Sequence, residues 1–486
     1  MFQTSLSPEA LHVALARARS GHPVFAHTGL RGASESPRQP VHTVYGGAHL
    51  FKADSARKLG AVALRALAER APDFAAFARA IGLPGAEALP AHHDEALALS
   101  AAIDAGPGAA ARAPGPSGPA PLAHGVYARV LDKLRREPVE DLRIDFEDGY
   151  GVRPGREEDE HAAAAAREVA LGMASGGLPP FLGIRIKSLT EASAERGLRT
   201  LDIFLSALVA ATGGALPPGF VVTLPKVSTP EQVAALADAL DALEAALELP
   251  AGAIQLELMV ETTAAILGPR GEVALPRLIE AARGRCAGAH FGAYDYTASC
   301  EITAAHQRLD HPACDFARHV MQVVLAGSGL RLSDGASNIL PVAPHRAPPG
   351  GALTPRQIED NQRAVERAWR LKYTQVRRAL EGGIYQGWDL HPAELPVRYA
   401  AVYAFFLEGV DATAERLRSF VDRAAQATVA GTVFDDAATG QGLLNFFLRA
   451  TSAGALTEAE VAARTGLTPD ELRGRSFQAI VERRSA

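Results

Sequence analysis

Carboxylates follow several short apolar runs of this 486-residue sequence. They are Asp145, Glu147 and Asp148 in LRIDFEDGYG, Glu261 at the end of IQLELMVE, and Asp295 at the end of HFGAYD. Carboxylates that converge repel one another strongly unless a cation lies among them. The ligands on these runs are oxygens, without a His/Cys cluster, so a hard divalent ion fits best and we expect Mg²⁺.

Glu261 and Asp295 are separated by a plausible length for one strand–helix–strand repeat, so they could lie side by side as direct metal ligands. Mg²⁺ keeps several waters and typically takes only one or two protein carboxylates. The remaining positions would be open to a chelating substrate.

Two basic residues follow neighbouring apolar runs. Arg185 ends FLGIR, and Lys226 ends FVVTLPK. A buried charge at Arg185 is costly without an anionic partner, which favours substrate contact over a structural ion pair. Lys226 could form a Schiff base, but that mechanism would leave the carboxylates unexplained.

Eight short apolar or β-branched runs alternate with Ala/Leu/Arg-rich segments of helical spacing, which indicates parallel strands joined by helices. The runs are Val41–Gly46, Leu142–Asp148, Phe181–Lys187, Phe220–Lys226, Ile254–Glu261, Ala289–Asp295, Gly329–Gly335 and Tyr385–Pro392. Eight such units predict an α/β fold, the closed (β/α)8 TIM barrel, and no GxGxxG or GxxxxGK[ST] supports a nucleotide-binding sheet. In such a barrel the carboxyl ends of the strands form one mouth, where the chemistry lies.

The pattern predicts three regions: an N-terminal helical segment over 1–40, a barrel over 41–400 and a C-terminal helical extension over 401–486. An insertion at about 60–138 follows the first strand. It contains an Ala/Gly/Pro-rich stretch over 105–121 that cannot hold a regular element for long.

Composition narrows the class of protein. A net charge of −6 argues against nucleic acid as a partner. No apolar run approaches the roughly 20 residues of a membrane helix, and the first residues lack a signal-peptide core, so we expect a cytoplasmic protein without a membrane partner. Three widely spaced cysteines suit buried thiols.

Six motifs, in order, carry a resemblance to a known family: LRIDFEDGYG, GIRIKS, VTLPKV, LMVETTAAI, HFGAYDYTAS and GWDLHP. Between about Val41 and Ala400 the chain resembles the citrate lyase β-subunit and HpcH/HpaI aldolase family. That family belongs to the phosphoenolpyruvate/pyruvate-binding barrels, with malate synthase and malyl-CoA lyase as relatives. Six motifs in register are specific where one alone would be weak.

The resemblance implies a Mg²⁺-dependent carbon–carbon lyase or aldolase that acts on 2-oxo acids or their 3-hydroxyacyl products, and a homo-oligomer. By motif, Glu261 and Asp295 would ligate the metal and Arg185 would contact the oxyanion. Gly292 and Ala293 would contact the substrate.

The acidic pair Glu147 and Asp148 corresponds to family residues that organise metal-bound water or take part in proton transfer. We favour Asp148 as the general base, with Asp145 or Glu147 adjusting its pKa through like charge. In coenzyme A-dependent relatives an aspartate of a C-terminal lid handles the proton, for which this chain offers Asp435 and Asp436. A coenzyme A thioester substrate therefore stays open.

Two other functions are weighed. A phosphotransferase that uses phosphoenolpyruvate would keep the barrel and metal, since that molecule and the pyruvate enolate share a shape. A ligand-binding regulator would use 456–476, which has a helix-turn-helix pattern, to bind DNA. The near-balanced charge of 456–476 favours a packing or oligomer helix instead.

Some polar residues have structural explanations. His290, His306, His311 and His391 lack the spacing of a zinc site, which favours hydrogen-bonded structural histidines. Asp334 follows the seventh run in SDGASN, a turn signal, and is only a marginal site candidate.

Overall fold

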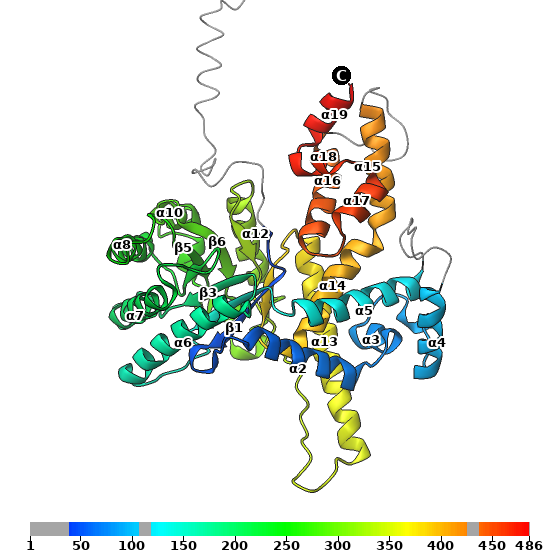
Figure 1. Ribbon diagram of the computed structural model, residues 1–486, viewed down its shortest axis with the longest axis horizontal. Helices are drawn as coiled ribbons and strands as arrows, with labels where there is room; N and C mark the ends of the chain where they lie inside the picture. The colour runs from blue at the N-terminus through cyan, green and yellow to red at the C-terminus, as the bar shows by residue number, and fades with distance from the viewer. Residues whose placement is uncertain (1–37, 106–117, 425–436, 486) are drawn as a thin grey trace, which may run out of the picture.

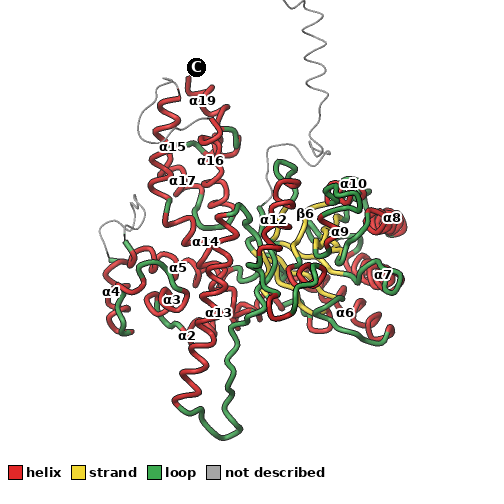
Figure 2. Tube along the Cα trace, turned by 180° about the vertical axis from the view of Figure 1, so that it is seen from behind, coloured by secondary structure: helices red, strands yellow, loops and turns green. Residues whose placement is uncertain are grey.

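The computed structural model describes residues 38–105, 118–424 and 437–485, and Figures 1 and 2 show it from opposite sides. Nearly all of the predicted N-terminal segment, and both Asp435 and Asp436, lie outside these ranges. Within them, eight parallel strands pair in the order β7-β6-β5-β4-β3-β2-β1-β8.

The strands match the eight apolar runs closely. They are β1 His42–Gly47, β2 Asp141–Asp145, β3 Phe181–Arg185, β4 Val221–Leu224, β5 Gln255–Val260, β6 Cys286–Phe291, β7 Arg331–Ser333 and β8 Gly387–Asp389. β1 pairs with β8, and a single parallel bridge joins Ser333 to Gln386 between β7 and β8. The Asp334 amide also donates to the Gln386 carbonyl at 2.8 Å. The sheet therefore curls into the predicted (β/α)8 barrel.

Helices surround the barrel, as Figure 2 shows in red around the yellow strands. They are α6 Gly155–Ser175, α7 Ala194–Thr212, α8 Pro230–Ala246, α10 Leu275–Ala281, α12 Pro312–Leu325, α13 Pro355–Glu381 and α14 Leu395–Glu408, with short α9 Thr263–Ile266 and α11 Ala293–Ser299 at the mouth. Local sequence sets their ends. α8 begins with a capping box between Thr229 and Gln232, and α6 ends at Gly176 in the left-handed conformation.

Between β1 and β2, the part of the chain that the structure describes contains four α-helices: α2 Ser55–Arg70, α3 Phe74–Ile81, α4 His93–Asp104 and α5 Pro119–Arg136. They lie to one side of the barrel beside α13 and α14 (Figure 1). Phe77 of α3 meets Trp369 of α13 edge-on at 5.8 Å between ring centroids. This connection therefore packs against α13 through aromatic side chains.

The C-terminal helical extension is confirmed. It consists of α15 Val410–Ala424, α16 Ala437–Ser452, α17 Glu458–Thr465, α18 Pro469–Gly474 and α19 Phe477–Ser485, and rises beyond α14 in Figure 1. α17 packs against α15 and α16. The pair α17 and α18 buries Val461, Leu467 and Leu472. α18 begins with two acidic residues, which supports packing over DNA binding.

A partly buried ion pair in this extension predicts a pH effect. Arg484 donates to both carboxylate oxygens of Glu471 at 2.7 and 2.8 Å. The Arg484 hydrogen bonds lower the pKa of Glu471 to about 2, so the stabilisation is present above the ordinary pKa of 4.5 and is lost as the pH falls toward 2. We expect Glu471→Gln to lower the free energy of unfolding by about 1–3 kcal/mol at pH 7, and by less at pH 3, in urea unfolding monitored by circular dichroism.

Asp470→Asn is the matched control for this prediction. Asp470 pairs with Arg473 on the same helix, but its side chain is 81 % exposed, so the expected change is below about 1 kcal/mol. Equal losses in the two variants, or a Glu471→Gln effect that is the same at pH 3 and pH 7, would contradict the assignment.

No helix in the described ranges combines the length and apolar character needed to cross a membrane.

Candidate active site

The mouth, meaning the carboxyl-end opening of the barrel, brings predicted residues from several strands into one charged cluster. Arg185 is the last residue of β3, Glu261 follows β5 directly, and Lys226 follows β4 by two positions. Asp295 differs from expectation: β6 ends at Phe291, and Asp295 lies in the first turn of α11. The Tyr296 amide donates to the Gly292 carbonyl, so the chain turns into a helix where the sequence suggested more strand.

Arg185 is fixed by Asp145. Its Nε and Nη2 donate to the two Asp145 oxygens at 2.7 and 2.6 Å, and both side chains are buried. Asp145 also accepts from the amides of Glu147 and Gly149 at 3.0 and 2.7 Å. A Cβ on Gly149 would lie 2.6 Å from Asp145 Oδ2, which explains the glycine. Asp145 therefore orients Arg185, whereas one of the sequence hypotheses gave it the role of adjusting the pKa of Asp148.

The third guanidinium nitrogen of Arg185, Nη1, faces Glu147 and Asp148. Nη1 lies 3.2 Å from Glu147 Oε2 and 3.9 Å from Asp148 Oδ2. With Nε and Nη2 taken by Asp145, Nη1 is the atom best placed to meet an anionic ligand.

Beneath Arg185 lies an aromatic layer that the sequence did not reveal. The guanidinium stacks over the Tyr45 ring at 4.8 Å. Tyr45 Oη lies 3.1 Å from His290 Nδ1, and Trp388 Nε1 donates to the same nitrogen at 3.1 Å. Because a Trp nitrogen only donates, Nδ1 acts as the acceptor, and Nε2 lies 3.2 Å from Glu257 Oε2. His290 is thus a structural histidine.

Other secondary candidates also have structural roles. His311 and His391 accept from the amides of Ala313 and Ala393, which caps the turns that they begin. Asp334 is buried and pairs with Arg318 at 2.9 Å, so its carboxylate is occupied by an ion pair.

Lys226 lies at the centre of the acidic cluster. Its Nζ donates to Glu147 and lies 3.2 Å from Asp148 Oδ2 and 3.5 Å from Asp295 Oδ2. Burial favours a neutral amine, but the Glu147 hydrogen bond and the charges of Glu261, Glu147 and Asp148 raise the pKa of Lys226 above its ordinary value. A protonated amine is not a nucleophile, which argues against the Schiff-base alternative.

Glu261 is the most perturbed carboxyl of the cluster. Burial raises its pKa to about 8, with the Asp295 charge acting in the same direction and Lys226 and Arg185 opposing it. The Lys226 amide donates to Glu261 Oε1 at 2.7 Å. Burial beside a second carboxylate disfavours the ionised form of a carboxyl group, which accounts for the direction of this shift.

The neighbouring acids differ in environment. Burial raises the pKa of Glu147 despite the nearby charges of Arg185 and Lys226. Burial also acts to raise the pKa of Asp148, but the hydrogen bond with Glu147 and the charges of Lys226 and Arg185 prevail and lower it. Asp148 is 59 % exposed, so it is an ionised carboxylate within reach of a ligand from solvent.

The donor set fits a hard divalent ion. The cluster contains more acids than cations. Its cations are Arg185 and Lys226, and the acids that they contact are Asp145, Glu147, Asp148, Glu261 and Asp295. Within the described residues, no three His, Cys, Asp or Glu side chains form a ready metal site. An ion held by Glu261 and Asp295 would take its other ligands from water and substrate, as is typical of Mg²⁺ in proteins.

Gly292 provides the space that Glu261 occupies. A Cβ at this position would lie 2.4 Å from Glu261 Oε2 and 2.5 Å from Glu261 Cβ. Gly292→Ala should therefore displace the carboxylate and weaken Mg²⁺ binding at least about tenfold in isothermal titration calorimetry, as expected when a metal ligand is misplaced. Gly442→Ala, at an exposed position of α16 where nothing lies within 4 Å of the added Cβ, is the control that should bind normally. Wild-type affinity in Gly292→Ala would contradict the placement of Glu261.

The predicted substrate contacts of Gly292 and Ala293 stay predictions. The Gly292 amide donates to the Val260 carbonyl at 3.0 Å, and Ala293 is buried, with its carbonyl accepting from Thr297 Oγ1 at 2.7 Å. The polar backbone atoms named here are engaged within the protein.

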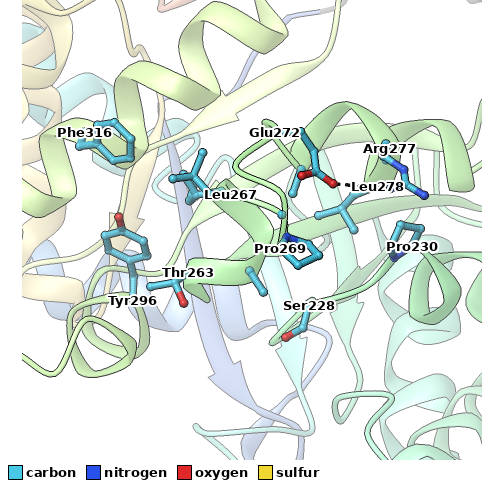
Figure 3. Close-up of a pocket in the computed structure, with 14 residues that line it drawn as sticks. Ser228, Pro230, Thr263, Leu267, Pro269, Glu272, Arg277, Leu278, Tyr296 and Phe316 are labelled. Carbon is cyan, nitrogen blue, oxygen red and sulfur yellow. Dashed lines mark ion pairs between the residues drawn. The ribbon is translucent and has the colours of Figure 1, made fainter.

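An apolar cavity of about 410 Å³ borders the segments that carry both predicted metal ligands. Figure 3 shows Tyr296 and Phe316 at one end of its lining and Pro230 at the other. Tyr296 directly follows Asp295, and Thr263, also in the lining, lies two residues after Glu261. The lining includes none of the predicted site residues.

The fold and site define a (β/α)8 barrel with an acidic mouth that suits a hard divalent cation. A family model described as Domain of unknown function (DUF6986) matches residues 30–480, and the chain belongs to this family. No curated protein sequence matches the chain.

Solved structures resemble the barrel at low identity. A citrate lyase from Burkholderia xenovorans LB400 has a TM-score of 0.50 and 19 % identity, over 70 % of this chain and 92 % of that chain. Malate synthase from Haloferax volcanii has a TM-score of 0.39 and 16 % identity, over 74 % and 92 % of the chains. Protein CitE from Mycobacterium tuberculosis, in complex with magnesium and acetoacetate, has a TM-score of 0.34 and 18 % identity, over 57 % and 86 %. The first likeness supports the motif resemblance at the level of the fold.

Proposed function

We propose that this protein is a Mg²⁺-dependent carbon–carbon lyase or aldolase that acts on a 2-oxo acid unit or a 3-hydroxyacyl substrate. The observation that carries the proposal is the convergence of Glu261 and Asp295 beside Arg185 at the barrel mouth, with too few cations to balance the acids. The six sequence motifs of the citrate lyase β-subunit and HpcH/HpaI aldolase family support the same chemistry.

Breaking or forming a carbon–carbon bond next to a carbonyl passes through an enolate, so the site must supply positive charge where oxygen becomes negative. A Mg²⁺ ion held by Glu261 and Asp295 would supply Lewis acidity at the carboxylate and keto oxygens of the substrate. Arg185 adds a hydrogen bond from Nη1, which its bidentate pairing with Asp145 holds in a fixed direction.

Asp148 is the proposed proton acceptor. Its pKa lies below the ordinary range and its side chain is exposed to the mouth, so it is ionised and accessible at neutral pH. Glu147 is less suited, because it is largely buried and burial raises its pKa. In the cleavage direction Asp148 would take the proton of the substrate hydroxyl as the adjacent carbon–carbon bond breaks.

Substrate release assays test this proposal. Purified protein would be incubated with malyl-CoA, citramalyl-CoA and 4-hydroxy-2-oxo acids, with Mg²⁺ or with EDTA, and pyruvate or glyoxylate would be measured. We expect release from at least one of these substrates, its loss in EDTA and its recovery on adding Mg²⁺. Release that persists in EDTA, or no release from any of them, would overturn the proposal. A coenzyme A thioester is distinguished from a free hydroxy-oxo acid by which substrate reacts.

A further inference from the structure

Lys226 occupies a strained backbone position at the centre of the mouth. Its φ is +52°, in the left-handed region that non-glycine residues rarely adopt. Such a conformation persists only where surrounding contacts enforce it. Here the Lys226 amide donates to Glu261 Oε1 at 2.7 Å, so the same residue that strains the backbone contacts a predicted metal ligand.

The ammonium of Lys226 contacts acids from two further segments. It donates to Glu147, lies 3.2 and 3.3 Å from the two Asp148 oxygens, and lies 3.5 Å from Asp295 Oδ2. Through backbone and side chain together, Lys226 connects acids that follow β2, β5 and β6. The structure therefore contains its own cation at the place where the carboxylates would otherwise repel one another.

A divalent cation between Glu261 and Asp295 would share the charge of Asp295 with this ammonium. Two positive charges beside one carboxylate repel each other, and each weakens the attraction that the other experiences. Occupancy by the metal and contact between Lys226 and Asp295 therefore oppose each other.

We propose that Lys226 is an internal counter-ion that competes with the divalent cation for Asp295 and thereby sets the affinity of the mouth for metal. The inference rests on the proposed metal site. When metal binds, the ammonium leaves Asp295 and keeps its contacts with Glu147 and Asp148, beside the proposed proton acceptor. The competing cation is part of the chain, so the acidic cluster stays ordered when metal is scarce.

Metal titration of the full-length protein without substrate tests this inference. Wild type, Lys226→Met, Lys226→Arg and the control Lys52→Met would be titrated with Mn²⁺ in isothermal titration calorimetry. Lys52 is exposed and pairs with Glu168, outside the acidic cluster. We expect Lys226→Met to bind Mn²⁺ at least about fivefold more tightly than wild type, a typical size for coupling between two sites. Lys226→Arg and Lys52→Met should stay near wild type.

A second measurement guards against a folding defect. Lys226→Asn keeps a residue that tolerates left-handed backbone, and should show a larger Mn²⁺-dependent rise in melting temperature than wild type. Lys226→Met and Lys226→Asn proteins that bind Mn²⁺ no more tightly than wild type would overturn the inference alone. Failure of wild type to bind any divalent cation would instead overturn the proposed function.

Discussion

Glu261→Gln and Asp295→Asn are each expected to lower kcat/KM for Mg²⁺-dependent release of pyruvate or glyoxylate by roughly 10³-fold, about 4 kcal/mol of transition-state stabilisation. An amide of the same shape is neutral, so each change removes one of the two negative charges that would attract the ion. Initial rates at several Mg²⁺ concentrations give the measurement, and excess Mg²⁺ should recover only part of the loss.

Glu160→Gln is the control for these two variants. Glu160 lies on α6 in an exposed pair with Arg156, and its loss should leave kcat/KM within about twofold. Unchanged release in both Glu261→Gln and Asp295→Asn would show that these carboxylates are not the metal ligands. Melting temperatures of all three variants separate a lost site from a lost fold.

Asp145→Ala is expected to cause the largest loss of stability, about 3–5 kcal/mol, because it leaves the buried Arg185 guanidinium without its bidentate partner. The change also leaves the backbone amides of Glu147 and Gly149 without the carboxylate that accepts their hydrogen bonds. Urea unfolding monitored by circular dichroism at pH 7 gives the measurement.

The exposed Arg156–Glu160 ion pair on α6 is again the control. Glu160→Ala breaks a pair whose side chains are 64 % and 92 % exposed, and should change the free energy of unfolding by less than about 1 kcal/mol. If Asp145→Ala costs no more than Glu160→Ala, the Arg185–Asp145 pair does not hold the mouth together as described.

The barrel could be predicted from the sequence because its strands are buried on both faces. Such strands appear as near-continuous apolar runs, and Val221–Leu224 and Gln255–Val260 both lie inside apolar or β-branched runs of the sequence. The boundary of β6 could not be predicted, because AHFGAYD is apolar through the start of α11. The hydrogen bond from the Tyr296 amide to the Gly292 carbonyl shows where the strand ends and the helix begins.

The convergence of Glu261, Asp295 and Arg185 could also be predicted, since parallel strands in a barrel present their carboxyl ends at one mouth. The choice of ion-pair partners within the mouth could not be predicted. Asp145 and Arg185 are adjacent only because β2 and β3 pair in register, and nothing in LRIDFED distinguishes the acid that orients Arg185 from the acids that contact Lys226.

The role of Lys226 and the aromatic layer depends on geometry that sequence patterns do not carry. The left-handed backbone of Lys226 follows a proline in an otherwise ordinary strand motif. Tyr45, His290 and Trp388 come from β1, β6 and β8, and meet only in the closed barrel. Contacts of this kind depend on the relative positions of three strands, which the sequence pattern does not specify.

Electron paramagnetic resonance of Mn²⁺ tests most directly whether Glu261 and Asp295 together hold one hard divalent cation that a 2-oxo acid chelates. The full-length wild type and the Glu261→Gln/Asp295→Asn double variant would be titrated with Mn²⁺, with and without pyruvate. The account predicts one bound ion per wild-type chain, a spectrum altered by pyruvate, and no comparable binding in the double variant. Equal Mn²⁺ binding by the two proteins, or none by wild type, would contradict it.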